Sequence, residues 1–292
     1  MNHAKHPSAG NPRVSLTGYA TASAWAHFGF EYADWFDSRR GRALFLPMHY
    51  GCRALRPIAP AAGAFSESLY WRHRWFSAWA EAQAPNLAIE IGAGLSTRGI
   101  AHARKHPDMH WVDYDLADMV AARRARLAKH DVPGNYTLEV GDLLGPGLGG
   151  ALRTSADARV IAMTEGVTDY LDHAEKRRAW RAIAELLARL GGGRYLLEVH
   201  PRERIDTFGM PGRLLFDALR RISGRDLREQ LCANTDEAIA MLEDCGFTRV
   251  RVLPEDELVD AAHAPAPAHR AFVLIEACIQ PGPDVARRER AR

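Results

Sequence analysis

Two glycines that follow a buried acidic residue form the most distinctive chemical pattern in the chain. Glu90 lies within the apolar run 87–91, and Gly92, Ala93 and Gly94 follow that run directly. Glycine has no Cβ to keep a ligand away from the backbone, and the first N–H groups of a following helix have no helical partners. The pattern therefore predicts a strand, a tight turn and a helix that together cradle a cofactor.

Further acidic residues stand where later strands of the same kind should end. Asp115 ends the predicted strand 110–115, about 20 residues past the turn, where a carboxylate can accept hydrogen bonds from both ribose hydroxyls of a nucleotide. Asp142 follows the predicted strand 136–140 and can either take an adenine amino group or cap the next turn. Glu165 follows the predicted strand 158–163 and is either a ligand for a cationic group or an ordinary acid at the start of a helix.

The candidates for acid–base chemistry come later in the chain. His200 follows the predicted strand 194–199 and is the best-placed general base, or else a structural histidine before Pro201. Tyr170 can either orient a substrate or pack beneath the cofactor.

Strands and helices alternate through this region, which predicts an α/β fold with a mostly parallel, Rossmann-like sheet. In such a sheet the ligand lies at the carboxyl ends of the strands. The last two predicted strands, 248–253 and 271–279, have no helix between them, which predicts an antiparallel pair at the edge of the sheet. A nicotinamide cofactor is disfavoured, because the third glycine of G-x-G-x-x-G is replaced by Thr97.

The rest of the chain divides by composition. We expect a disordered tail at 1–13, a helical cap at 14–84, a cofactor-binding domain at 85–280 and a basic tail at 281–292. Within the cap, residues 47–63 contain three prolines and predict a loop, and 66–83 predicts a helix with three tryptophans on one face. The cap's aromatic residues either pack it on the sheet or line a substrate pocket. Residues 202–233 interrupt the alternation and predict an insertion that forms part of the cap.

Composition excludes several classes of protein. A formal net charge of +2 and a pI near 8.4 give no broad basic field, so nucleic acid is not expected as a partner. The four cysteines have no C-x-x-C spacing, and we predict neither a metal site nor a disulfide framework. No apolar run approaches the roughly 20 residues of a membrane helix, so we expect a soluble, cytoplasmic protein.

Three segments in order, EIGAGLSTRG at 90–99, WVDYDL at 111–116 and VIAMTEGVTDYL at 160–171, resemble the leucine carboxyl methyltransferase family. That family also contains bacterial polyketide O-methyltransferases of the tetracenomycin type. The resemblance implies a class I methyltransferase sheet with an antiparallel last strand, a helical cap and S-adenosylmethionine (SAM) as cofactor. It also implies a set of cofactor contacts. The methionine portion would be contacted by Glu90, Gly92, Ala93, Gly94 and Glu165, the ribose by Asp115 and Leu116, and the adenine by Asp142 and Leu143. The cofactor carboxylate would be held by Arg72, with Arg74 as the alternative.

The function expected from these patterns is SAM-dependent methylation of a carboxylate or hydroxyl oxygen of a small metabolite, and we expect the enzyme to act in secondary metabolism. A carboxylate is already ionised at neutral pH, whereas a phenol with a pKa near 10 benefits from a base. One alternative is methylation of a protein C-terminal carboxylate. Another is a SAM- or nicotinamide-binding protein without catalysis. The oligomeric state is not predicted.

Overall fold

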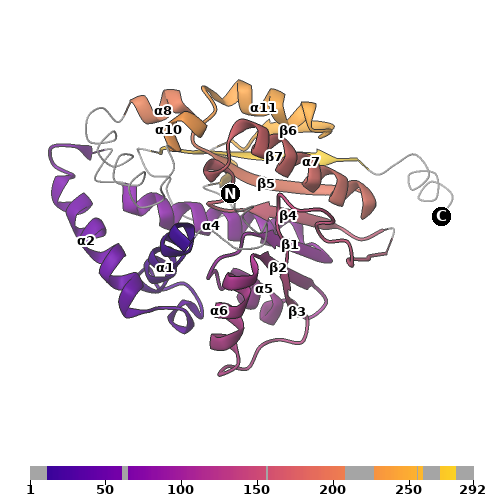
Figure 1. Cartoon of the computed structure of the whole chain (residues 1–292), viewed down its shortest axis with the longest axis horizontal. Helices are drawn as coiled ribbons and strands as arrows, with labels where there is room; N and C mark the ends of the chain where they lie inside the picture. The colour runs from indigo at the N-terminus through magenta and orange to yellow at the C-terminus, as the bar shows by residue number, and fades with distance from the viewer. Residues whose placement is uncertain are drawn as a thin grey trace, which may run out of the picture.

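A seven-stranded sheet forms the centre of the molecule (Figure 1). The structure is a computed structural model of the chain and describes residues 12–60, 65–155, 157–207, 227–254, 256–258 and 270–280. The strand order is β3-β2-β1-β4-β5-β7-β6. The strands are β1 (Leu87–Ile91), β2 (His110–Asp115), β3 (Tyr136–Val140), β4 (Val160–Thr164), β5 (Gly193–Val199), β6 (Arg249–Val252) and β7 (Val273–Ile279).

Strands β1 to β5 are parallel, and β7 runs antiparallel to both of its neighbours, β5 and β6. This confirms the predicted Rossmann-like sheet and the predicted antiparallel pair at its edge. Because the parallel strands share one direction, the residues that follow β1, β2, β3, β4 and β5 meet at one edge of the sheet, which we call the carboxyl edge.

Helices cover both faces of the sheet and enclose two apolar cores. On one face, Leu87 and Ile89 of β1 share a core with Trp180 of α7 (His173–Arg189). On the other face, Ala88 shares a core with Trp75 of α4 (Phe65–Gln83). Successive side chains of a strand point to opposite faces, so a strand covered on both sides is apolar throughout. The helices of eight residues or more are α1 (Pro12–His27), α2 (Arg39–Leu55), α4 (Phe65–Gln83), α5 (Arg98–Lys105), α6 (Ala117–Leu127), α7 (His173–Arg189) and α11 (Thr235–Asp244).

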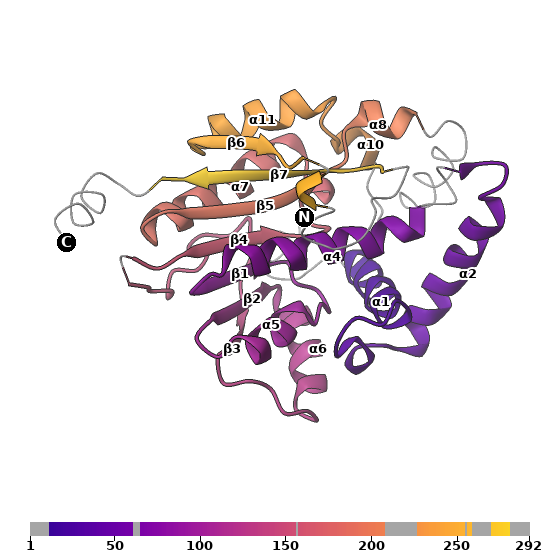
Figure 2. The same cartoon turned by 180° about the vertical axis from the view of Figure 1, so that it is seen from behind.

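Helices α1 and α2 lie beyond the carboxyl edge (Figures 1 and 2). Because β7 runs antiparallel to β5, the parallel strands point away from the arrowhead of β7, toward these two helices. Polar contacts made by Thr97 and Arg126 tie the segment between these helices to the sheet domain. The Thr97 hydroxyl donates to the Glu31 carbonyl at 2.7 Å, and Arg126 donates to the Asp37 carbonyl at 3.1 Å. The N-terminal helices therefore stand next to the residues that follow the parallel strands.

The loop predicted at 47–63 is wrong for most of its length, because α2 continues through Pro47 to Leu55. The Ser38 hydroxyl caps this helix by accepting from the Gly41 N–H at 3.0 Å. Proline removes one helical hydrogen bond but has a backbone angle that a helix accepts. Burial of Phe45 and His49 on either side of Pro47 keeps the helix continuous. Residues 61–63 of the predicted loop lie outside the described residues.

Other predicted segments fall partly outside the described residues. Of the predicted disordered tail, residues 1–11 are outside, whereas residues 12 and 13 begin α1, which corrects that boundary. The predicted insertion begins with α8 (Arg202–Asp206) and includes α10 (Leu227–Gln230), with 208–226 outside. The predicted basic tail, 281–292, also lies outside.

Buried Glu276 of β7 connects four elements. Its carboxylate accepts from Trp79 of α4 at 2.9 Å and from Arg251 of β6 at 3.0 Å, and it lies 3.5 Å from Arg194 of β5. A buried carboxylate is tolerated when it is paired and hydrogen-bonded in this way.

All four cysteines are free. Among the described residues, none of the helices combines the length and the apolar character that crossing a membrane requires.

Candidate functional site

The turn after β1 has the backbone that the sequence predicts. Gly92 and Gly94 have φ angles of +72° and +56°, which other residues rarely adopt. A Cβ on Gly92 would lie 2.5 Å from a methyl carbon of Val167, so this position is closely packed. A Cβ on Gly94 would meet nothing within 4 Å, so open space lies beside the turn. The turn is thus closed on the Gly92 side and open on the Gly94 side, with buried Ala93 between.

Asp115, at the end of β2, is bound directly to this turn. Its Oδ2 accepts from the Gly94 N–H at 2.6 Å and its Oδ1 accepts from the Leu116 N–H at 2.8 Å. Burial raises the pKa of Asp115, although the two N–H groups act in the opposite direction. Each carboxylate oxygen has a second lone pair. The side chain can therefore accept two more hydrogen bonds next to the open side of the turn.

Asp142 and Leu143 follow β3 at the same edge. Asp142 Oδ1 accepts from the Leu144 N–H at 2.9 Å, which is the turn-capping geometry considered from the sequence. Leu143 is buried in the core on the α7 face of the sheet. The turn uses only Oδ1 of Asp142, so its other oxygen is available for the predicted hydrogen bond with the adenine.

Glu165, after β4, lies at the centre of a buried cluster of charges. Its Oε1 accepts from Arg72 Nε at 3.0 Å, and its Oε2 lies 2.9 Å from His73 Nδ1 and accepts from Arg98. Burial alone would raise the pKa of Glu165, but Arg98, His73 and Arg72 outweigh it and hold the pKa well below its usual range. Arg72 and Glu165 were both predicted to contact the cofactor, and the fold brings them together.

Glu90 points into the same cluster from β1. Its Oε1 accepts from Arg98 at 2.6 Å, and Arg98 has no exposed side-chain surface. Burial raises the pKa of Glu90 to about 8, against the opposing effect of Arg98. The direct partner of Glu90 is therefore an arginine beneath the glycine turn.

Glu198, near the end of β5, completes the cluster. It accepts from the Gly166 N–H and lies 3.5 Å from Arg72. Burial raises its pKa to about 8, although Arg72 opposes the shift. Its Oε2 is buried without a hydrogen-bond partner among the residues that the structure describes. That oxygen can receive a donor from a ligand.

His200, after β5, is paired with Asp169. Its Nδ1 lies 2.5 Å from Asp169 Oδ2, and Lys176 Nζ lies 3.8 Å from the other oxygen of Asp169. Burial alone would raise the pKa of Asp169, but His200 and Lys176 hold it below its usual value. A carboxylate on Nδ1 fixes the orientation and tautomer of the imidazole.

Tyr170 is tied to the N-terminal helices. Burial raises its pKa, and its hydroxyl makes a hydrogen bond with the side chain of Thr17 in α1. Tyr170 thus joins the segment after β4 to the helices beyond the carboxyl edge.

Sequence reasoning missed four residues of this region: His73, Arg98, Asp169 and Glu198. Arg98 begins α5 in a segment that reads as the exposed start of a helix. Asp169 and His200 come from different segments, as do Arg98 and Glu165, so spacing in the sequence carries no signal for either pair. Glu198 carried one usable signal, because a charged residue inside an apolar strand is buried and needs a partner.

Comparisons with known proteins agree on the fold. No protein-family model and no curated protein matches the sequence. A protein from Thermobifida fusca YX, assigned as a methyltransferase, aligns with a TM-score of 0.56 and 18% identity over 90% of this chain and 94% of its own. An O-methyltransferase family protein from Burkholderia thailandensis aligns with a TM-score of 0.52 and 16% identity over 93% of this chain and 72% of its own.

A protein from Nostoc punctiforme PCC 73102, assigned as an O-methyltransferase, aligns with a TM-score of 0.50 and 14% identity over 75% of this chain. The alignment spans 59% of the Nostoc protein. Identities of this size establish a shared fold. The chain therefore has the Rossmann-like fold of these methyltransferases, as the sequence predicted.

Proposed function

We propose that the chain, which has a methyltransferase fold, is a SAM-dependent enzyme that methylates an oxygen atom of a small metabolite. The observation that carries the proposal is the contact between Asp115 and Gly94, beside open space at the carboxyl edge. Two of the structural neighbours are assigned to O-methyltransferases, which supports the same reaction class. The finer assignment to the leucine carboxyl methyltransferase family rests on the three sequence segments.

The residues at the glycine turn fit a nucleoside that carries an amino acid. Asp115 has lone pairs free for two ribose hydroxyls, and Gly94 leaves room where a side chain would stand. Asp142 and Leu143 follow the neighbouring strand β3, where the resemblance puts the adenine. Bound SAM would supply an electrophilic methyl group on a sulfonium.

The buried charges fit the amino-acid portion of this cofactor. Arg72 is 11% exposed and would pair with the carboxylate, while Glu165 offsets the charge of Arg72 and Arg98. The unpartnered oxygen of Glu198 would accept from the ammonium group. In this arrangement Glu90 acts through Arg98, as a positioning residue.

The pair of His200 and Asp169 favours a hydroxyl acceptor over a carboxylate. A phenol with a pKa near 10 must lose its proton as it attacks, whereas a carboxylate is already ionised. In the proposed reaction His200 takes the proton, and Asp169 stabilises the imidazolium that forms. Tyr170 would orient the acceptor from the neighbouring turn.

Aromatic rings from the segment after α1 and from α4 fit a small, planar acceptor. Phe30 packs edge-on against His73 with ring centroids 4.7 Å apart, and Tyr70 contacts both Phe28 and Phe30. His73 also contacts Glu165, so these rings adjoin the charged cluster. The second candidate function is methylation of a protein C-terminal carboxylate. The third is binding of SAM or a nicotinamide cofactor without catalysis.

Calorimetry with S-adenosylhomocysteine, and separately with NAD, tests the cofactor. We expect micromolar binding of S-adenosylhomocysteine and no binding of NAD. Asp115→Asn removes a charged acceptor worth about 1.5–3 kcal/mol, which corresponds to roughly 10- to 150-fold weaker binding. Asp118→Asn is the matched control, because Asp118 is exposed at the start of α6. Equal affinities for the two variants, or no binding by the wild type, would contradict the proposal.

A further inference from the structure

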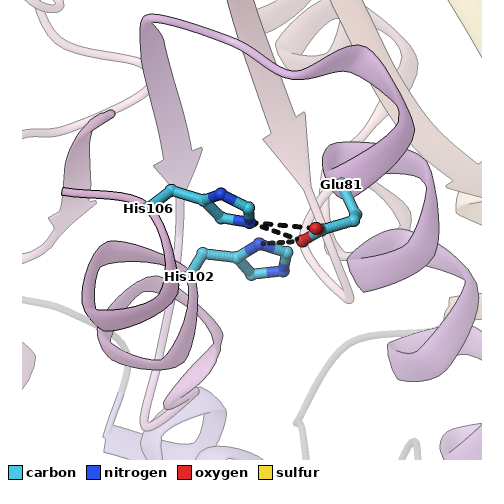
Figure 3. A group of neighbouring side chains, drawn as sticks. All are labelled: Glu81, His102 and His106. Carbon is cyan, nitrogen blue, oxygen red and sulfur yellow. Dashed lines mark hydrogen bonds and ion pairs between the residues drawn. The ribbon is translucent and has the colours of Figure 1, made fainter. Parts of the chain in front are cut away.

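Two histidines and a glutamate meet on the surface of α4 and α5, apart from the carboxyl edge. His102 and His106 are four residues apart on α5 and its C-terminal cap, so they project from the same face. Glu81 reaches them from the last turn of α4. Figure 3 shows the two rings one above the other, with the carboxylate of Glu81 facing both.

The spacing of their polar atoms is close to that of a metal site. His102 Nδ1 lies 3.4 Å from Glu81 Oε2, and His106 Nε2 lies 2.9 Å from both carboxylate oxygens. One ligand atom from each residue lies within 4.8 Å of the others. Zinc bonds of about 2.0–2.1 Å in a tetrahedron put neighbouring ligand atoms about 3.3 Å apart. Small side-chain rotations are enough to reach that geometry.

His102 supplies a second, independent indication of a ligand. The residue is 7% exposed, and its Nδ1 has no hydrogen-bond partner among the described residues although it points at Glu81. Its ring is held in this orientation by stacking on Trp111, with centroids 5.0 Å apart. A buried polar atom without a partner is costly, and a bound cation would remove that cost.

The cluster is also open enough to load an ion. The side chains of Glu81 and His106 are 36% and 35% exposed. Lys105 donates to Glu81 Oε1 at 2.8 Å, but its side chain is 64% exposed and can swing into solvent. Solvent at the open side can supply a water as the fourth ligand.

We propose that Glu81, His102 and His106 form a binding site for a divalent transition metal, with Zn²⁺ as the ion that best fits two imidazoles and one carboxylate. The site joins α4 to α5 and does not depend on the proposed methyltransferase activity. Helix α5 begins beside the glycine turn and runs back along β1, so His106 lies near the amino ends of the strands. The metal would therefore act as a clamp between two helices, remote from the reacting atoms.

Titration of metal-free protein, without an affinity tag, tests the site. We expect one equivalent of Zn²⁺ to bind, and Co²⁺ in its place to give the visible absorption of a low-coordinate ion with nitrogen ligands. At a hundredfold excess of free Zn²⁺ over Kd, the melting temperature should rise by about 4 °C. His106→Ala and Glu81→Gln should each weaken Zn²⁺ binding at least tenfold, and Lys105→Ala should not weaken it.

His110→Ala is the matched control, because His110 is an exposed histidine outside the cluster, bonded to Thr137. This variant should bind Zn²⁺ like the wild type. His106→Ala is preferred to a change at His102, because His106 is half-buried and its loss leaves the stacked His102 ring in place. The proposal is overturned if the wild type binds no Zn²⁺, if His106→Ala binds it unchanged, or if His110→Ala loses as much affinity as His106→Ala.

Discussion

Replacing Glu165 with glutamine tests whether the buried charges hold the carboxyl edge together. Glu165→Gln keeps the shape of the side chain and removes its charge, which leaves Arg72 and Arg98 without their shared anion. The side chain of Arg98 is fully buried and that of Arg72 is 11% exposed, so water can replace little of the lost interaction. We expect the variant to fold with substantially lower stability.

The magnitude follows from the burial of the partners. Breaking a buried ion pair by removing one partner costs about 3–5 kcal/mol. When Glu165 is lost, Glu90 can ionise beside Arg98 and offset part of this cost. That compensation defines the lower end of the range. At about 2.1 cal/mol/K per residue, a chain of 292 residues has an unfolding entropy of about 0.6 kcal/mol/K. The expected fall in melting temperature is therefore about 5–8 °C.

Scanning calorimetry at pH 7 measures this difference. Glu185→Gln is the matched control, because Glu185 is exposed on α7 and the same charge is removed. The control should melt within about 1 °C of the wild type, as most surface substitutions do. If Glu165→Gln also melts within about 1 °C of the wild type, the cluster does not stabilise the fold and the reasoning is refuted.

Two further predictions concern Glu198 and Asp169. Burial raises the pKa of Glu198 from 4.5 to about 8, so the folded state holds this proton more tightly; the stability that Glu198 contributes is fully present below pH 4.5 and is lost as pH rises to about 8. Glu90, whose pKa is also raised to about 8, contributes in the same way, so Glu198→Gln should remove roughly half of the combined loss of stability between pH 6 and pH 9 in melting scans. Identical pH profiles of the variant and the wild type would contradict this. Asp169→Asn should lower kcat for a phenolic acceptor by about 10²-fold, with unchanged binding of S-adenosylhomocysteine, because His200 loses its anionic partner. Steady-state kinetics with a phenol and a carboxylic acid check this, and an equal loss for both acceptors would exclude the role of a general base.

The sheet was predictable because its strands are short apolar runs separated by turn residues. Leu87–Ile91 is buried at every position, and that burial requires the apolar run seen in the sequence. Helix α2 was not predictable past Pro47, because the packing of Phe45 and His49 is a tertiary effect that outweighs the local preference of proline.

The sequence predicted those residues of the candidate site whose position relative to a single strand is enough to identify them. The glycine turn follows β1 and Asp115 ends β2, so both positions could be predicted from the order of the strands. The partner of Glu90 could not, because Arg98 becomes buried only when β1, β4, α4 and α5 pack together. Arg72 and Glu165 were named from a resemblance, and the contact between them follows from the fold.

The position of β7 has a consequence for the order in which the protein can assemble. Strand β7 comes last among the strands along the chain, yet it fills the place between β5 and β6 and carries Glu276, the shared acceptor for both neighbours. During synthesis β5 is therefore an open edge, and β6 has no neighbour, until β7 leaves the ribosome. Open strand edges pair readily with other chains, so this interval is when the nascent protein most needs protection from aggregation.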